Sequence, residues 1–325
     1  MTETFSELVI SHPHADHYNG LLRCASSGTG GVGRGPLLVD GATFFHPRVP
    51  ENPEARNLLF RLMALNTVLS GLPETALSSA VVACAAGGIA RQPLMRGDAI
   101  TLAGQPVDVL WPPKTLDARS SSRLQRLVQS YDDLAADAAQ QGDEQLLRVL
   151  ATIRDRWENV EDALYGPTYA SSELRERETP PVLDGDLSDD EGIVERERDT
   201  ADSLRSLRHA ITRGANLLSL VLATADRRYA FLGDADASVH GDVASVLVDY
   251  ELEVLMSAHH GTYFSPELSH LKSRYVISSV GPPLLANVRD EYDRIGMHLR
   301  THRAGDITAW VSDSGTWVVA GSPRP

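Results

Sequence analysis

The sequence contains almost no cysteine and almost no lysine. Among its 325 residues, only positions 24 and 84 are cysteine, and only positions 114 and 272 are lysine. Two cysteines cannot build a disulfide framework or a cysteine-rich zinc site, so we expect a reducing, cytoplasmic environment. Arginine supplies nearly all the positive charge, and we attribute this bias to a high-GC genome and not to function.

Long hydrophobic runs are absent as well. A helix that crosses a membrane needs ~20 consecutive apolar residues, and the sequence has no run of comparable length. The first five residues, Met1–Phe5, are polar and acidic, unlike those of a secretory signal. We therefore expect a protein without membrane contact.

Positive charge is scarce in the chain as a whole. The net charge of −14 argues against a constitutive nucleic-acid binder, because phosphate backbones are attracted by basic patches. It does not exclude a hydrolase that meets phosphate groups through metal ions, since the ions then carry the local positive charge.

The most informative pattern is an H-x-H-x-D-H cluster near the start. His12, His14, Asp16 and His17 directly follow the apolar run Leu8–Ile10. Side chains alternate along an extended chain, so the first two histidines point to the same side. Imidazole nitrogens and carboxylate oxygens are ligands that Zn²⁺, Mn²⁺ and iron accept. The cluster predicts a strand end, then a metal-binding turn, then a helix that begins near residues 19–21.

The chain beyond this cluster alternates between expected strands and helices. Apolar spacing predicts helices over residues 53–70 and 79–90. Two strands are expected over residues 94–111, joined at Ala103–Gln105. Residues 121–163 have helical spacing that Gly142 interrupts, which indicates an antiparallel pair of helices. The alternation favours a layered α/β fold.

Residues 114–208 differ in composition from the rest of the chain. They contain 22 acidic and 13 basic residues, so they carry most of the net negative charge. Within them, residues 171–200 are acidic and include Pro180 and Pro181, a composition typical of partly disordered segments.

The order of the motifs resembles that of the metallo-β-lactamase fold. Besides the first cluster, Tyr229–Asp234 resembles the strand-Gly-Asp element of that fold. Leu255–Thr262 contains His-His-Gly-Thr, which resembles one branch, the ComEC-like metallo-hydrolases and their soluble relatives. Asn216–Leu222 and Thr301–Ile307 resemble two further strands of that branch. The resemblance covers residues 6–112 and 214–320.

This resemblance implies an αββα sandwich made of two halves. Residues 1–113 would form the N-terminal half and residues 209–325 the C-terminal half. Residues 114–208 would then be a helical, acidic insertion between them.

The resemblance also implies metal ligands for one or two ions of Zn²⁺ or Mn²⁺. The expected ligands are His12, His14, Asp16, His17, Asp234, His259 and His260. The first two histidines would serve one ion, Asp16 and His17 the other, and Asp234 would bridge both. Asp16 and Asp234 are the expected catalytic residues. Of the last two histidines we favour His259 as the direct ligand, because it lies nearer the strand end.

Two departures from the family pattern stand out. Only eleven residues precede His12, so the usual opening pair of strands is missing. We expect a second copy, a partner chain or a rearranged part of residues 114–208 to cover the resulting sheet edge, since bare edges promote association. In addition, Ser279–Leu284 contains no histidine where the branch carries Tyr-Gly-His-Pro.

These features together predict metal-dependent hydrolysis with a metal-bound hydroxide as nucleophile. The resemblance alone indicates a phosphodiester or nucleotide-type substrate. β-Lactam, thioester and lactone substrates fit the same residues. The alternative is a catalytically weak or inactive interaction module that acts with a partner protein. The departures favour this alternative, whereas the intact ligand set disfavours it.

Overall fold

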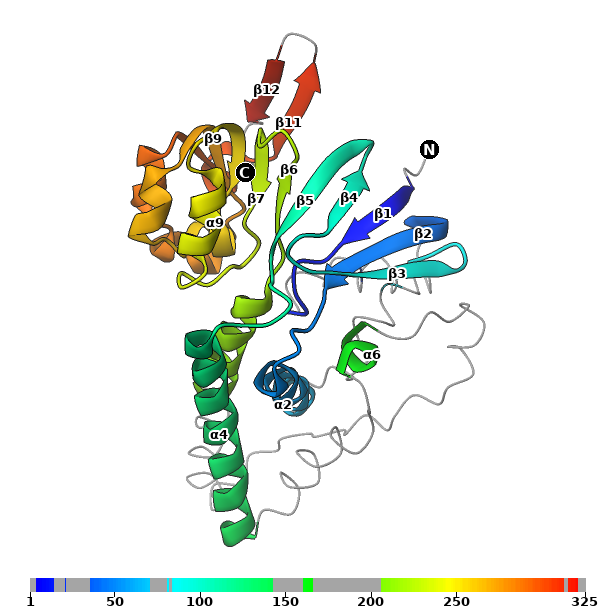
Figure 1. Cartoon of the computed structure of the whole chain (residues 1–325), viewed down its shortest axis with the longest axis vertical. Coiled ribbons are helices and arrows are strands. Elements are labelled where there is room, and N and C mark those ends of the chain that lie inside the picture. The colour runs from blue at the N-terminus through cyan, green and yellow to red at the C-terminus, as the bar shows by residue number, and fades with distance from the viewer. Residues whose placement is uncertain are drawn as a thin grey trace. The chain divides into compact units, whose positions relative to one another are not determined.

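The chain forms a mixed α/β protein, as predicted (Figure 1). The computed structural model describes residues 4–14, 21, 36–70, 81, 84–142, 160–165, 206–312 and 315–320. Its contacts divide the chain into two compact units. The first unit comprises residues 1–93 and 114–215, and the second comprises residues 94–113 and 216–325.

The first unit contains a three-stranded sheet in the order β1-β2-β3. Its strands are β1 (Phe5–Val9), β2 (Leu38–Pro47) and β3 (Ile89–Leu94). β1 runs parallel to β2, with Val9 beside Phe45. The central strand β2 is the most buried of the three, as expected for a strand with neighbours on both sides. Within the described residues β1 is an edge strand, so the predicted covering of an edge stays a prediction.

Helix α2 (Pro53–Ser70) has the bounds that the sequence predicts. Pro53 occupies its first position. A backbone N–H there would have no partner within the helix, so the lack of one in proline costs no hydrogen bond. Leu58, Leu62 and Leu65 recur every three or four residues and are almost completely buried. They form the apolar stripe by which an amphipathic helix packs on its neighbours.

Helix α4 (Ala118–Gln141) begins and ends at residues suited to those positions. The carboxylate of Asp117 accepts a hydrogen bond from the N–H of Ser120 at 2.7 Å, and this bond lowers the pKa of Asp117. Gly142 follows the helix with a φ of +74°, a conformation that favours glycine. The break predicted at Gly142 is therefore confirmed.

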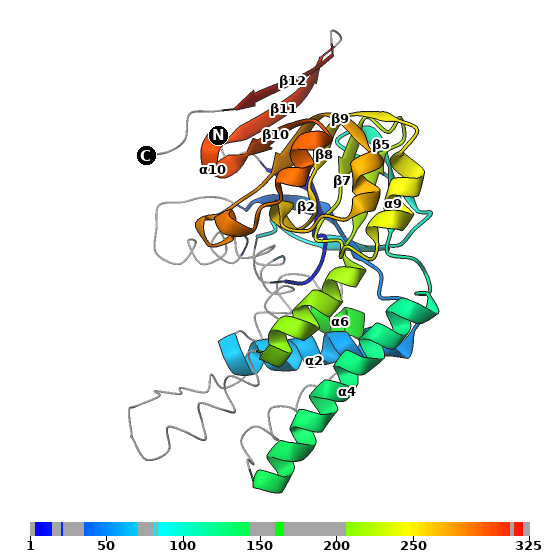
Figure 2. The same ribbon diagram turned by 90° about the vertical axis from the view of Figure 1, so that its left-hand side faces the viewer.

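Helix α4, which lies in the segment 114–208, packs on α2 within the first unit (Figure 2). Arg61 of α2 forms an ion pair with Asp132 of α4 at 2.7 Å. A Cβ added at Gly214 would lie 2.5 Å from a methyl group of Leu127, so α4 also lies close to the helical residues 206–215. The short helix α6 (Val160–Tyr165) contacts α2 as well. The compact units thus differ from the three segments predicted from sequence.

The second unit is built on a seven-stranded sheet in the order β10-β9-β8-β7-β6-β5-β4. The four strands from β10 to β7 are parallel, and the remaining neighbours are antiparallel. The strands are β4 (Ala99–Leu102), β5 (Gln105–Trp111), β6 (Val221–Thr224), β7 (Tyr229–Phe231), β8 (Glu251–Met256), β9 (Lys272–Ser278) and β10 (Met297–Arg300). A hairpin of β11 (Ile307–Ser312) and β12 (Gly315–Ala320) completes the unit.

Helices in the second unit are short. They are α9 (His240–Leu247), α10 (Thr301–Ala304) and the 3₁₀ segments η2 (Asn216–Leu218), η3 (Ala258–Gly261), η4 (Pro266–His270), η5 (Pro282–Asn287) and η6 (Asp290–Arg294). The carboxyl ends of parallel strands lie at one edge of a sheet, where many proteins of this class bind ligands. Asp234, Ser257, Ser278 and Arg300 all lie at or just beyond those ends of β7, β8, β9 and β10.

The predicted hairpin at Ala103–Gln105 is confirmed. β4 and β5 pair around it, and Ala103 and Gly104 both have positive φ values, +48° and +78°. Two such residues give the tight turn that matches the twist of antiparallel strands.

The helix predicted over residues 79–90 is wrong at its C-terminal end. Residues 89 and 90 belong to β3. Gly88 donates its N–H to the carboxylate of Asp40 at 2.8 Å, and Gly41 donates to Gly88 O at 2.8 Å. Two consecutive glycines end helical periodicity here and let the chain turn into the sheet.

Two strand expectations also shift. Asn216–Leu218 is a 3₁₀ turn, and the strand begins only at Val221. Thr301–Ala304 forms the helix α10, and the closing strand begins at Ile307. The turn Asn216–Leu218 is buried, whereas no residue of α10 is buried.

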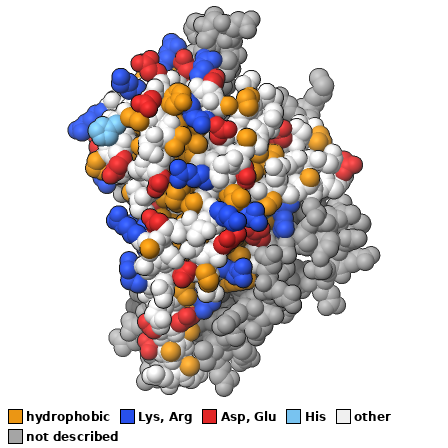
Figure 3. All heavy atoms as spheres, in the orientation of Figure 1, with side chains coloured by type: hydrophobic (Ala, Val, Ile, Leu, Met, Phe, Trp, Pro, Cys, Tyr) orange, Lys and Arg blue, Asp and Glu red, His pale blue; other side chains and the backbone are white. Residues whose placement is uncertain are grey.

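The described surface has two further properties. No helix in the described part of the chain is both long and apolar enough to cross a membrane. On the face drawn in Figure 3, described basic and acidic side chains are interspersed and do not form a broad basic area.

Candidate metal centre

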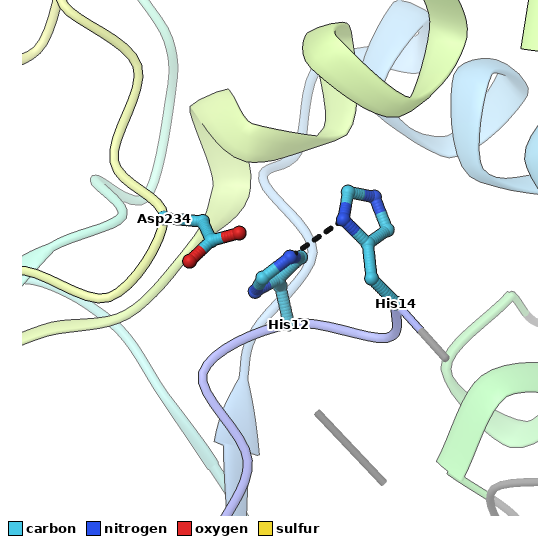
Figure 4. A group of neighbouring side chains, drawn as sticks. All are labelled: His12, His14 and Asp234. Carbon is cyan, nitrogen blue, oxygen red and sulfur yellow. Dashed lines mark hydrogen bonds between the residues drawn. The ribbon is translucent and has the colours of Figure 1, made fainter. Parts of the chain in front are cut away.

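His12 and His14 lie in a buried turn that follows β1 in the first unit. The pairing of β1 with β2 continues to Ile10, whose N–H donates to Phe45 O at 3.0 Å. Beyond it the chain bends through residues 11–13. Nε2 of His12 lies 2.6 Å from Nδ1 of His14, and the two rings meet edge to face (Figure 4). The sequence expectation that both rings point to the same side is therefore confirmed.

The short contact between these rings constrains their protons. Of two facing imidazole nitrogens, only one can carry the hydrogen, and the other must offer its lone pair. His12 Nδ1 is also engaged, at 3.1 Å from the hydroxyl of Ser11. Both rings are buried, so this pair brings converging nitrogen donors into a site shielded from water.

Asp16 and His17 lie outside the described residues. Their predicted roles as ligands, and that of Asp16 in catalysis, stay predictions. Of the helix predicted to begin near residues 19–21, only Leu21 is described, and it is helical.

Asp234 forms part of a second group of polar residues, in the second unit. It follows β7 and Gly233, whose positive φ of +54° turns the chain at the strand end. The N–H of Asp234 donates to the Ser219 hydroxyl at 2.9 Å, so Ser219 satisfies this backbone group. The carboxylate is buried, and its Oδ2 lies 3.7 Å from Nε2 of His259.

His259 and His260 occupy an unusual backbone conformation. Their φ values are +46° and +60°, and that of Gly261 is +87°. A positive φ is strained for residues with a Cβ, and such strain persists only where surrounding contacts impose it. Here His259 N donates to Gly233 O at 2.9 Å, Arg289 N donates to Gly261 O at 2.8 Å, and Ala258 N donates to the Tyr292 hydroxyl at 3.1 Å.

The two histidine rings face different partners. The ring of His259 stacks on Tyr263 at 4.1 Å between centroids, and its Nδ1 contacts the Thr262 hydroxyl. Its Nε2 is the nitrogen that faces Asp234. His260 instead directs Nδ1 to Ser279 O at 2.9 Å. The contact with Asp234 favours His259 as the direct ligand, in line with the sequence preference, which stays a prediction.

Three other polar residues of the second unit have different surroundings. Asp236 accepts hydrogen bonds from the N–H and hydroxyl of Ser238 at 3.0 and 2.7 Å, so it stabilises the turn that precedes α9. Neither polar atom of the buried Asn216 amide has a hydrogen-bond partner within the described residues. His298 forms hydrogen bonds with Ser278 and Asp293.

Comparison with known proteins identifies no relative of this chain. No family model matches the chain, and neither a curated protein nor a solved structure matches it. The chemistry of the site therefore rests on its own residues.

Proposed function

We propose that this chain is a metal-dependent hydrolase in which His12, His14 and Asp234 bind the metal ion. All three are buried, and each offers one atom of a kind that metals accept. The observation that carries the proposal is the convergence of His12 Nε2 and His14 Nδ1 to 2.6 Å in a buried turn. A hydrogen bond satisfies the two facing nitrogens in the absence of metal, and a metal ion that replaces its proton would be bound by lone pairs of the same two rings.

The donor set fits a transition metal. Two imidazoles and a carboxylate suit Zn²⁺ or Mn²⁺, whereas the thiolates that select other metals are missing from the group. His259 is a further candidate ligand, since its Nε2 faces the carboxylate of Asp234. When bound, the ion would supply Lewis acidity and an activated water for hydrolysis.

The chain's own residues would orient these ligands. The Ser219 hydroxyl accepts the N–H of Asp234 and so fixes the position of the carboxylate after β7. Stacking on Tyr263 restrains the ring of His259. Partners of this kind set the direction in which ligands point, and their loss commonly weakens metal binding.

The resemblance to the ComEC-like branch of the metallo-β-lactamase fold supports the finer parts of this proposal. The scarcity of cysteine supports a cytoplasmic location. The resemblance supports the αββα sandwich and a phosphodiester or nucleotide-type substrate. These parts rest on the motifs His12–His17, Gly233–Asp234 and His259–Thr262.

Turnover of generic phosphodiesters with added Mn²⁺ or Zn²⁺ tests the proposal. We expect metal-dependent hydrolysis by the wild type, and loss of roughly a hundredfold or more in Asp234→Asn and His14→Asn. His270→Asn is the matched control, because His270 is exposed and lies outside the ligand set. Equal rates in the wild type and Asp234→Asn would contradict the proposal. Metal binding without turnover on any substrate would support the interaction-module alternative.

A further inference from the structure

A row of hydrogen bonds crosses three parallel strands of the second unit. Ser257 follows β8, Ser278 ends β9 and His298 lies in β10. The Ser257 and Ser278 hydroxyls are 2.7 Å apart. Ser278 Oγ lies 2.7 Å from Nε2 of His298, and Nδ1 of His298 lies 2.9 Å from the carboxylate of Asp293. We call these four residues the serine–histidine row.

The acid at one end fixes the direction of every hydrogen bond in this row. A carboxylate can only accept, so Nδ1 of His298 carries the proton and donates to Asp293. Nε2 then accepts from Ser278, whose oxygen is left to accept from Ser257. Nε of Arg300 lies farther from the same Nδ1, at 3.2 Å, and the guanidinium also binds Asp293 at 3.1 Å. The shorter, charge-assisted contact decides the tautomer.

The distances are those of a Ser–His–Asp catalytic triad, but the surroundings exclude a nucleophile. Ser278 is 0% exposed. A Cβ added at Gly261 would overlap the Ser278 hydroxyl, so the backbone of η3 fills the place that a substrate carbonyl would need. The row must therefore act on η3 and not on a substrate.

Gly261 links the row to the two histidines of the candidate metal centre. It lies against both serine hydroxyls and directly follows His259 and His260. All three residues have positive φ values, so the backbone conformation of η3 depends on contacts with neighbouring residues such as the two serines. Tyr292 adds a second support, because its hydroxyl accepts the N–H of Ala258 and its ring lies 5.6 Å from that of His298.

We propose that His298 is a positioning residue for η3. Held by Asp293, it orients the Ser278 and Ser257 hydroxyls, and these fix the close approach of Gly261 and the left-handed backbone of His259 and His260. Its effect on metal affinity rests on the proposed function, whereas its effect on the backbone of η3 does not.

Two matched pairs of variants test this role. Asp293→Asn is compared with Asp290→Asn, because both carboxylates bind Arg300 but only Asp293 contacts His298. Ser278→Ala is compared with Ser273→Ala, because both serines lie in β9 and Ser273 binds Tyr275 O instead. The readouts are amide hydrogen exchange of His259 and Thr262 without metal, ¹⁵N shifts of the His298 ring, and the dissociation constant for Co²⁺.

We expect Asp293→Asn and Ser278→Ala to speed exchange of both amides about tenfold, the effect of losing about one net hydrogen bond. Both should weaken Co²⁺ binding by a similar factor, and Asp293→Asn should give ring shifts of mixed tautomers. Asp290→Asn and Ser273→Ala should stay near the wild type in all three readouts.

The pairs separate this inference from the proposed function. Equal exchange rates in Asp293→Asn and Asp290→Asn, together with equal rates in the two serine variants, would overturn the positioning role. If the exchange rates differ within each pair as expected, but neither the wild type nor any variant binds Co²⁺, the positioning role stands and the proposed metal function fails. If Asp293→Asn does not fold, the serine pair decides alone.

Discussion

Burial fixes the protonation state of His46 in the first unit. Its side chain is completely buried and stacks on Tyr165 with ring centroids 3.8 Å apart. Nδ1 donates to Pro47 O at 3.0 Å. Loss of hydration penalises the imidazolium form and lowers the pKa of His46 to about 3.

This shift makes stability depend on pH in a stated direction. Between pH 6.5 and about 3, the unfolded chain holds a proton at His46 that the folded chain lacks. The free energy of unfolding therefore falls as the pH falls, by up to ~1.4 kcal/mol per pH unit from this group. His46→Phe keeps the stack on Tyr165 but removes the titrating group, so its stability should fall less steeply.

Urea unfolding at several values between pH 6.5 and pH 5 measures the difference in slope. His270→Phe serves as the control, since His270 is exposed and should not change the slope. Parallel stability curves for the wild type and His46→Phe would show that His46 is protonated in the folded protein.

At the scale of elements, the backbone of η3 depends on its own Gly261 and on Ser278, which is distant in the sequence. Gly261 has a φ of +87° and no space for a Cβ against Ser278. Gly261→Ala should therefore cost about 1–3 kcal/mol of stability and weaken metal binding. Gly241→Ala is the control, because Gly241 lies in α9 and an added Cβ meets only Glu267 at 3.6 Å. Equal thermal unfolding of both variants would contradict this account of η3.

Local pattern explains which elements could be predicted. α2 has strong periodicity and was predicted with its exact bounds. The β4–β5 hairpin has a two-residue turn that was predicted correctly, although β4 begins at Ala99 and not at residue 94. Residues 79–90 read as helix because small apolar residues suit helices as well as strand ends, and their pairing with β2 is decided by the distant Asp40. The serine–histidine row leaves no local pattern either, since its partners Ser257, Ser278 and His298 come together only through sheet register.

At the scale of the whole molecule, helices α4 and α6 are part of the first unit. Leu124 and Tyr131 of α4 are buried, and Arg61 of α2 pairs with Asp132. Replacing residues 117–206 by a short Gly/Ser linker should expose the apolar stripe of α2. The composition of these residues suggests a dispensable insertion, but their packing indicates a contribution to the core.

Hydrogen exchange on that deletion variant measures the contribution for each unit separately. We expect the amides of α2 to lose protection, while those of β8 and β9 in the second unit keep theirs. Unchanged protection of α2 would show that residues 117–206 add nothing to the fold of the first unit.

The sequence could identify much of the candidate site because metal ligands are chemically distinctive. The spacing of His12 and His14 and the Gly-Asp and His-His-Gly motifs stand out in any chain. The orientation of His259 toward Asp234 and of His260 toward Ser279 O could not be read from them. That choice depends on left-handed backbone angles imposed by contacts with β7, β9 and Tyr292.

Metal affinity in a double-mutant cycle tests the central claim most directly. The wild type, His14→Asn, Asp234→Asn and the double variant are titrated with Zn²⁺ after removal of metal. If His14 and Asp234 bind the same ion, each single change should weaken binding by roughly a hundredfold or more, and the double variant should bind little more weakly than either single one. Zn²⁺ affinity unchanged by Asp234→Asn, or independent and fully additive losses, would contradict the claim.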